Sequence, residues 1–202
     1  MLGGLMDLLL IRHAEPVRIE EADQPADPPL HERGHTQAQA LAAWLADEPL
    51  DAVWSSPMRR ARETAAAVAT RLGMEVVVDE DLAEFDREAT SYIPLEELRA
   101  TRDQRWLAMV EGDLSEFEVD PEAFRNGVVA AIERVISVNP GRTVAVVCHG
   151  GVINAYVAEV LGIDRVLFFE PRYASINRVA ASRAGVRSIV SLNETAHLRG
   201  LL

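Results

Sequence analysis

The chain has 202 residues, of which 49% are hydrophobic and 26% are charged, a composition that indicates a globular protein with a sizeable core rather than a disordered chain. Its formal net charge of −12 disfavours a surface for duplex DNA or for an anionic membrane, because either would need clustered basic residues. Cys148 is the one cysteine, which excludes an internal disulfide and a cysteine-cluster metal site.

The N-terminal stretch "MLGGLMDLLLI" is apolar, but Asp7 interrupts it and it carries no basic leader. No other segment of the sequence approaches the roughly 20 consecutive apolar residues of a membrane span. We therefore expect a cytoplasmic protein. Because no shift in composition marks a linker, we also expect a single domain over residues 1–202.

Hydrophobic periodicity predicts strands that alternate with helices. In chain order we expect a strand over 8–11, a loop over 15–29, a helix over 35–46, a strand over 50–56, a helix over 57–72, a strand that starts at 74, a helix over 94–110, a helix over 121–138, a strand over 142–148, a helix over 153–161 and an antiparallel hairpin over 174–198. This alternation predicts an α/β fold of three layers, α/β/α, whose mostly parallel sheet has about five to six strands with helices on both faces. A helical insert at about 86–126 is expected to cover the site and to select the substrate.

The helix that follows the second strand has clear boundary signals. Ser56 is a suitable N-cap, Pro57 suits the first helical position, and Gly73 can end the helix. These boundaries place Arg60 in the first turn, where free N–H groups and the helix dipole favour a bound anion.

Polar side chains follow the predicted strands at their carboxyl ends, where open α/β sheets bind their ligands. They are Arg12 and His13 after the first strand, Arg59 and Arg60 after the second, Glu84 after the third, and His149 after the strand over 142–148. Imidazoles and guanidiniums that converge on one crevice predict a pocket for a compact dianion such as a phosphoryl group. Backbone N–H groups of Gly150 and Gly151 would add donors at the start of the next helix.

Four motifs, "LLLIRHAEP", "SSPMRRARETA", "DLAEFD" and "VAVVCHGGVI", resemble in this order the histidine phosphatase superfamily, which has the phosphoglycerate mutase-like fold. The resemblance extends from residue 8 to "LNETAHL" near the C-terminus. It implies a phosphohistidine intermediate with no metal and no cofactor. The catalytic roles it implies are nucleophile for His13 and acid for Glu84, and Arg12, Arg60 and His149, the last counted with the catalytic residues, match the groups that hold the phosphoryl oxygens. From their chemistry alone, Arg59 and Gly150 are further candidates for substrate binding.

Some positions leave alternatives open. Ala14 stands where the family fingerprint has glycine, so we expect a turn after His13 that tolerates a Cβ atom. Arg59 fits phosphate binding or a solvated helix face equally well. The remaining histidines lack the spacing of metal ligands, so we expect no metal. In the insert, Tyr92, Trp106 and Phe117 could line the pocket, but we interpret them as packing residues between helices.

The leading hypothesis is a metal-independent phosphatase that acts on a small phosphorylated metabolite. The alternatives are a phosphoglycerate-type phosphomutase and an inactive member of the fold that binds a phosphorylated ligand. A metal-dependent hydrolase is a third alternative, which activity in chelator would exclude. The alternating C-terminal tail could also pair between subunits as a homodimer.

Overall fold

A computed structural model describes residues 5–165 and 167–201 of the chain. In chain order its strands and longer helices are β1 (Met6–Arg12), α1 (Glu32–Trp44), β2 (Ala52–Ser55), α2 (Arg59–Leu72), β3 (Val76–Val78), α3 (Leu95–Thr101), α4 (Gln104–Glu111), α5 (Pro121–Val138), β4 (Thr143–Cys148), α6 (Gly150–Leu161), β5 (Ile176–Ala181) and β6 (Arg187–Glu194). Single 3₁₀ turns are η1 (Leu45–Asp47), η2 (Glu80–Leu82), η3 (Ser115–Phe117) and η4 (Ala196–Leu198). Within these described ranges, no helix is both long and apolar enough to cross a membrane.

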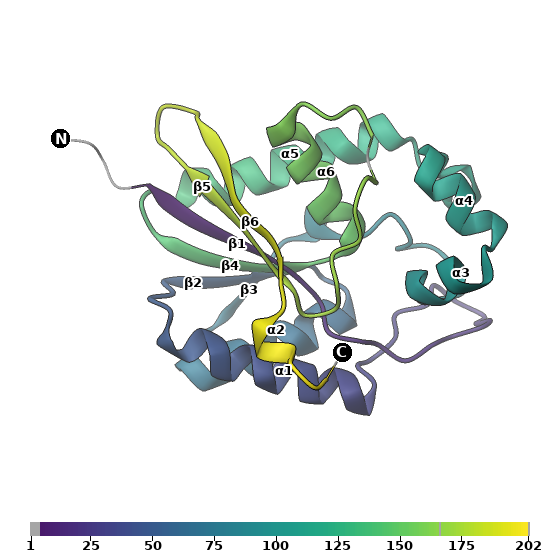
Figure 1. Cartoon of the computed structure of the whole chain (residues 1–202), viewed down its shortest axis with the longest axis horizontal. Coiled ribbons are helices and arrows are strands. Elements are labelled where there is room, and N and C mark those ends of the chain that lie inside the picture. The colour runs from purple at the N-terminus through teal and green to yellow at the C-terminus, as the bar shows by residue number, and fades with distance from the viewer. Residues whose placement is uncertain (1–4, 166, 202) are drawn as a thin grey trace.

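The six strands form one sheet in the order β3-β2-β4-β1-β5-β6 (Figure 1). The strands β1 to β4 are parallel, whereas β5 and β6 form an antiparallel hairpin at one edge. The expected mostly parallel sheet with a C-terminal hairpin is therefore confirmed. Because β1 pairs with β4, Arg12 at the end of β1 lies opposite Cys148 at the end of β4.

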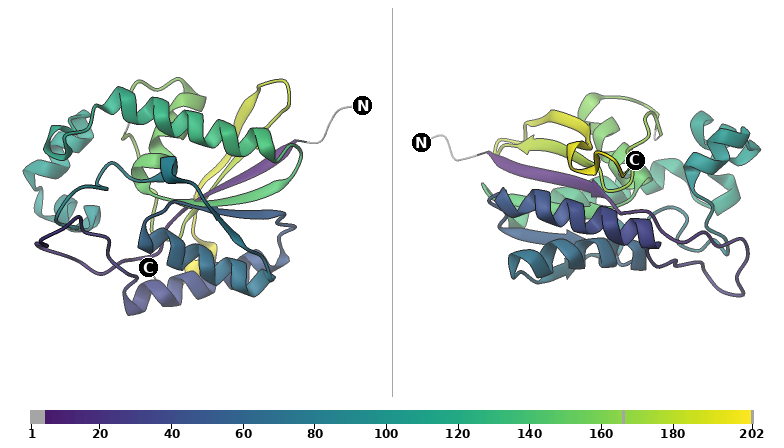
Figure 2. Two further views of the ribbon diagram at one scale, coloured as in Figure 1. Left: turned by 180° about the vertical axis from the view of Figure 1, so that it is seen from behind. Right: turned by 60° about the horizontal axis from the view of Figure 1, so that its bottom comes forward.

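The side chains of β1 alternate between two cores. Leu8 and Leu10 pack with residues of α5 and α6, whereas Leu9 and Ile11 pack with residues of α1 and α2. In Figures 1 and 2 these two pairs of helices cover opposite faces of the sheet. A strand covered on both faces has no polar side, which explains its continuous apolar run. The three-layer fold is thus confirmed.

Two helices, α3 and α4, lie outside the three layers (Figure 1). The prediction of one helix over 94–110 is wrong, because the chain turns at Arg102, whose φ of 53° is left-handed. Asp103 then caps α4 by accepting a hydrogen bond from the backbone N–H of Arg105 at 2.9 Å. The turn gives the insert two short helices in place of one long one, and α5 begins at Pro121, before the expected end of the insert.

The predicted start of α2 at Pro57 is also wrong, because the helix begins at Arg59. The Oγ atom of Ser56 accepts a hydrogen bond from the backbone N–H of Met58 at 3.2 Å, so Ser56 organises the turn before the helix instead of capping it. Arg60 still lies in the first turn, as expected. Smaller differences are the earlier starts of α1 and α6 and the short β3.

Candidate active site

The two histidines meet because hydrogen bonding between neighbouring strands continues past their ends. The backbone N–H of His13 donates to the carbonyl of Cys148 at 2.9 Å, and that of Ser56 donates to the carbonyl of Val147 at 2.9 Å. The chain segments that follow β1, β2 and β4 are thereby held side by side. As a result the ring centroids of His13 and His149 lie 5.1 Å apart.

The hydrogen bond of His13 determines which of its ring nitrogens is free. Nδ1 lies 2.8 Å from the carbonyl oxygen of Ala14, which can only accept a hydrogen bond, so Nδ1 carries the proton and Nε2 keeps its lone pair. The ring is 2% exposed. Burial, together with the nearby cations of Arg60 and Arg12, holds the pKa of His13 well below its usual range. The imidazole is therefore neutral at pH 7.

The turn after His13 accepts alanine without strain. Ala14 is fully buried, and its φ is not in the left-handed region that would require glycine. Its backbone N–H donates to Thr64 Oγ1 at 3.0 Å, which ties the turn to α2. The expectation of a turn that tolerates a Cβ atom is confirmed.

Arg12 is buried and held by groups distant in sequence. Its Nη1 atom donates to Glu96 Oε1 at 2.6 Å and to the carbonyl of Pro171 at 2.7 Å. The guanidinium carbon lies 3.8 Å from the ring centroid of Tyr173, a cation–π contact. These contacts fix the plane of the guanidinium in advance of any ligand.

Arg60 is held in the same way on α2. Its Nη2 atom donates to Asp86 Oδ1 at 2.8 Å, and its guanidinium carbon lies 4.7 Å from the ring centroid of Tyr92. The hydroxyl oxygens of Tyr92 and Tyr173 are 3.3 Å apart, so a pair of aromatic residues joins the two arginines.

Several buried nitrogen atoms of this cluster have no hydrogen-bond partner among the described residues. They are Nε of Arg12, Nε and Nη1 of Arg60, and Nδ1 of His149. A buried donor without a partner costs free energy, so such groups are rare unless a ligand or water completes them. The unpartnered guanidinium atoms make this cluster suited to an anion with several oxygen atoms.

Glu84 is buried beside the start of α6. Its Oε2 atom accepts a hydrogen bond from the backbone N–H of Gly151 at 2.7 Å, and its Oε1 atom accepts one from the N–H of Phe85 at 3.2 Å. Burial, assisted by the nearby charge of Asp86, raises the pKa of Glu84 to about 7. A carboxyl group with this pKa can both donate and accept a proton near neutral pH.

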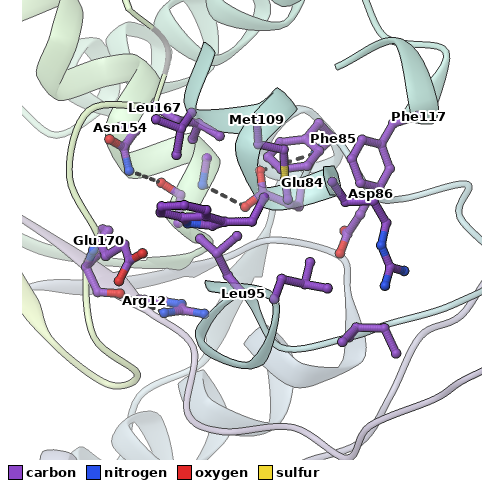
Figure 3. Close-up of a pocket in the computed structure, with 18 of the residues that line it drawn as sticks. Arg12, Glu84, Phe85, Asp86, Leu95, Met109, Phe117, Asn154, Leu167 and Glu170 are labelled. Carbon is purple, nitrogen blue, oxygen red and sulfur yellow. Dashed lines mark hydrogen bonds between the residues drawn. The ribbon is translucent and has the colours of Figure 1, made fainter. Parts of the chain in front are cut away.

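A pocket of about 300 Å³ opens at this edge of the sheet. Arg12, His13, Arg60, Glu84 and Gly150 line it, and Figure 3 shows Arg12 and Glu84 facing the cavity. The helices of the insert supply much of the opposite wall. Its volume suits a small metabolite.

Two predicted site residues do not line the pocket. His149 is fully buried beside His13 and is not among the pocket-lining residues, although its Nε2 atom lies 2.7 Å from Ser56 Oγ. Arg59 is half-exposed, pairs with Glu63 at 2.7 Å, and does not reach the pocket. The backbone N–H of Gly151 is occupied by Glu84 and so is not a free donor for an anion. Among the residues described, no group of three or more acidic, histidine or cysteine side chains could hold a metal ion.

The model of the family described as "Histidine phosphatase superfamily (branch 1)" matches residues 8–195. The chain belongs to the histidine phosphatase superfamily. This finding confirms the resemblance seen in the sequence, and with it the expectation of an enzyme of the histidine phosphatase type.

Similar histidine phosphatases carry the names of phosphatases and of mutases. "Phosphoserine phosphatase 1" of Hydrogenobacter thermophilus is 29% identical, over 96% of this chain and 95% of that protein. "Probable phosphoglycerate mutase GpmB" of Yersinia enterocolitica is 26% identical, over 96% and 95% of the two chains. The crystal structure of a phosphoserine phosphatase from Entamoeba histolytica with 3-phosphoglyceric acid has a TM-score of 0.73 at 23% identity, over 96% and 99% of the two chains. That structure shows that the fold is shared.

The sequence did not identify Glu96, Asp86 and Tyr173 as residues of this histidine phosphatase site. Glu96 and Asp86 hold the two arginines, and Tyr173 covers Arg12. Tyr92, named as a residue that could line the pocket, covers Arg60, and Ser56, expected as an N-cap, contacts His149. Acidic residues are frequent in the insert, so sequence alone offered no signal for the two that turn inward. Tyr173 follows a segment with no expected element.

Proposed function

We propose that this chain is a metal-independent phosphatase that hydrolyses a small phosphomonoester through a phosphohistidine on His13. The observation that carries the proposal is the set of unpartnered buried nitrogen atoms of Arg12 and Arg60 beside a neutral His13. A phosphoryl group placed there would complete these donors and bring its phosphorus atom within reach of the free Nε2 lone pair. Positioning and charge stabilisation supply most of the catalysis of phosphoryl transfer.

In the first step, Nε2 of His13 attacks phosphorus and the bond from phosphorus to the ester oxygen breaks. Glu84, protonated because its pKa is about 7, gives its proton to the departing alkoxide. In the second step, water attacks phosphorus, the phosphorus–nitrogen bond breaks, and the Glu84 carboxylate takes the proton of the water. The products are an alcohol and inorganic phosphate, and the enzyme is regenerated.

His149 supports this chemistry from its position beside His13. Ser56 Oγ accepts a hydrogen bond from Met58, which leaves its own proton free to donate to Nε2 of His149. The proton of the His149 ring would then lie on Nδ1, as a donor toward the phosphoryl oxygens. Burial, followed by the charge of Arg60, holds the pKa of His149 well below its usual range, so this donor is neutral.

The test is release of inorganic phosphate from an aryl phosphate in EDTA by wild type and by His13→Ala. We expect activity to survive the chelator and to fall at least about 10³-fold in the variant, because the nucleophile is lost. His35→Ala, at an exposed position of α1, is the control and should keep full activity. Activity that His13→Ala retains, or that EDTA abolishes, would contradict the proposal.

A phosphomutase would use the same first step but would return the phosphoryl group to the product. The two reactions are distinguished by supplying a phosphoglycerate and measuring released phosphate against the isomeric ester. We expect released phosphate to predominate. A dominant isomeric ester would assign the chain to the mutases.

We also propose that β6 can pair with a second copy as a homodimer. It is an edge strand, and Val186 and Val190 on the hairpin are 61% and 59% exposed. Sedimentation equilibrium measures the mass in solution, and a monomer at all concentrations would contradict this proposal.

A further inference from the structure

Away from Arg12 and Arg60, most of the side chains that line the pocket are apolar. The apolar side chains that line it are Phe85, Ile93, Leu95, Leu98, Trp106, Met109, Val110, Phe117, Leu167, Phe168 and Phe169. Phe85 directly precedes the insert, and the others come from the insert and from the segment after α6. Figure 3 shows Leu95, Phe85, Met109, Phe117 and Leu167 around the cavity.

Part of this wall is apolar surface that the fold leaves unburied. Leu98, Met109 and Leu114 form a buried cluster, and several apolar side chains pack against it while staying only partly buried. Among these, Phe85, Leu95, Trp106, Phe117 and Leu167 also line the pocket. Tyr92, Trp106 and Phe117 therefore line the cavity, the alternative that the sequence left open, and Trp106 and Phe117 also pack against the cluster of the insert. Apolar cavities favour apolar ligands over water.

Most of the charged side chains that line the pocket already have partners. Glu96 and Asp86 pair with Arg12 and Arg60. Arg105 is held by Asp103 through its Nε and Nη2 atoms, at 2.9 and 2.8 Å.

Glu170 pairs with Arg99, whereas Glu116 and Arg165, which also line the pocket, are exposed to solvent. Within the described residues, an ammonium or carboxylate group on the alcohol part of a substrate would therefore meet apolar side chains or existing ion pairs, except at Glu116 and Arg165, where exposure to solvent weakens any pairing. Burying such a charge without a counter-ion is costly.

We propose that the alcohol part of the preferred substrate is a hydrocarbon, either an alkyl chain or an aromatic ring, rather than a charged amino-acid or glycerate backbone. This proposal rests on the proposed function, because it assigns the leaving group of the same reaction. Arg12 and Arg60 bind the phosphoryl group, and the apolar wall binds the carbon skeleton. Each methylene moved from water to such a wall contributes about fourfold in binding.

The experiment measures kcat/KM for a series of straight-chain alkyl phosphates from ethyl to hexyl, with phosphoserine and 3-phosphoglycerate alongside. Chain length barely changes the leaving ability of a simple alcohol, so differences along the series report binding of the chain. We expect kcat/KM to rise by about fourfold for each methylene, and hexyl phosphate to exceed both charged esters.

Trp106→Ala tests the wall itself. We expect it to lower kcat/KM for hexyl phosphate at least about tenfold and for ethyl phosphate by a smaller factor, because a longer chain buries more apolar surface against the wall. Trp44→Ala is the matched control, since Trp44 lies on α1, is 46% exposed and is not a lining residue. Leu167→Ala, outside the helices of the insert, provides a second variant if Trp106→Ala does not fold.

Binding of alkylphosphonates, which cannot be hydrolysed, separates this proposal from the proposed function. If the affinity measured by calorimetry rises with chain length, the result supports the apolar wall. If no ester is hydrolysed in that case, only the proposed phosphatase activity is overturned. A flat series in both experiments, or a preference for phosphoserine or 3-phosphoglycerate, would overturn the hydrocarbon substrate while leaving the phosphatase intact.

Discussion

Burial has opposite effects on the charges of the two central residues, His13 and Glu84. It keeps the imidazole of His13 neutral by lowering its pKa, and it keeps a proton on Glu84 by raising its pKa to about 7. In the proposed reaction, the nucleophile His13 and the acid Glu84 would therefore both be in their active protonation states between the two pKa values. Neither property is visible in the residue types alone.

The pKa of Glu84 predicts the alkaline limb of the pH profile. For an alkyl phosphate, activity should fall as the pH rises above about 7, because Glu84 loses the proton that the leaving oxygen needs. Glu84→Gln should remove this limb and lower kcat at least about 10²-fold. The measurement is kcat against pH for both proteins. The acidic limb, which lies below the usual pKa of histidine, should stay in both wild type and Glu84→Gln. An alkaline limb that Glu84→Gln retains would contradict the role of Glu84 as the acid.

The same shift has a consequence for stability. Because the folded-state pKa of Glu84 is raised from 4.5 to about 7, its contribution to stability is complete below pH 4.5 and is lost as the pH rises through 7. The loss is on the order of 3 kcal/mol. Glu84→Gln should gain stability relative to wild type over this window, as measured by urea unfolding at several pH values. A constant difference between the two proteins would contradict the raised pKa.

Through its ion pair with Arg12, Glu96 places a negative charge close to the position where the phosphoryl group would bind. It accepts a hydrogen bond from Arg12 at 2.6 Å, and its side chain is 38% exposed. Glu96→Gln keeps the shape and removes the charge, so KM for a phosphate ester should fall about threefold to tenfold with kcat little changed. The control is Glu97→Gln, since Glu97 pairs with Arg18 at 3.2 Å near the surface. A higher KM in Glu96→Gln would instead show that its charge is needed to orient Arg12.

At the scale of elements, the start of α6 positions Glu84. The N–H of Gly151 binds its carboxylate, and a Cβ atom on Gly151 would lie 2.3 Å from Glu84 Oε1 and 2.7 Å from the Phe85 ring. The sequence suggested Gly150 and Gly151 as free anion donors, whereas the helix start holds the acid at Gly151. Only glycine leaves room for the carboxylate there.

Gly151→Ala should therefore displace Glu84 and lower kcat at least about 10²-fold for an alkyl phosphate. Gly127→Ala is the matched control, because a Cβ atom at this position of α5 meets nothing within 4 Å. It should leave activity unchanged and slightly stabilise the helix. Circular dichroism checks that both variants are folded, and full activity in a folded Gly151→Ala would contradict this role.

At the scale of the whole molecule, the sheet order brings the site together. Placing β4 between β1 and β2 makes the carboxyl ends of three parallel strands neighbours, although 93 positions separate Ser56 from His149. The insert then covers this edge and meets the segment after α6 across the cavity. The resulting pocket combines charge at its base with an apolar wall.

The sequence by itself determined the alternation of strands and helices, the family, and the polar residues that end each strand. These follow from local signals, because periodicity, chain breaks and short motifs depend on neighbouring residues. The clearest example is α5, whose predicted range of 121–138 is the observed one. The turn at Arg102 was not predicted, because arginine seldom adopts a positive φ and no local sequence motif indicates a turn there.

Only the tertiary structure decided which groups surround the histidines. The partner of Arg12 is Glu96, 84 positions away, and the partner of Arg60 is Asp86. Both are acidic residues of the insert, which contains many others. Tertiary packing also leaves Arg59 outside the pocket and places the aromatic residues of the insert in the pocket wall. Contacts between distant segments depend on how all the elements pack, and that information is spread over the whole chain.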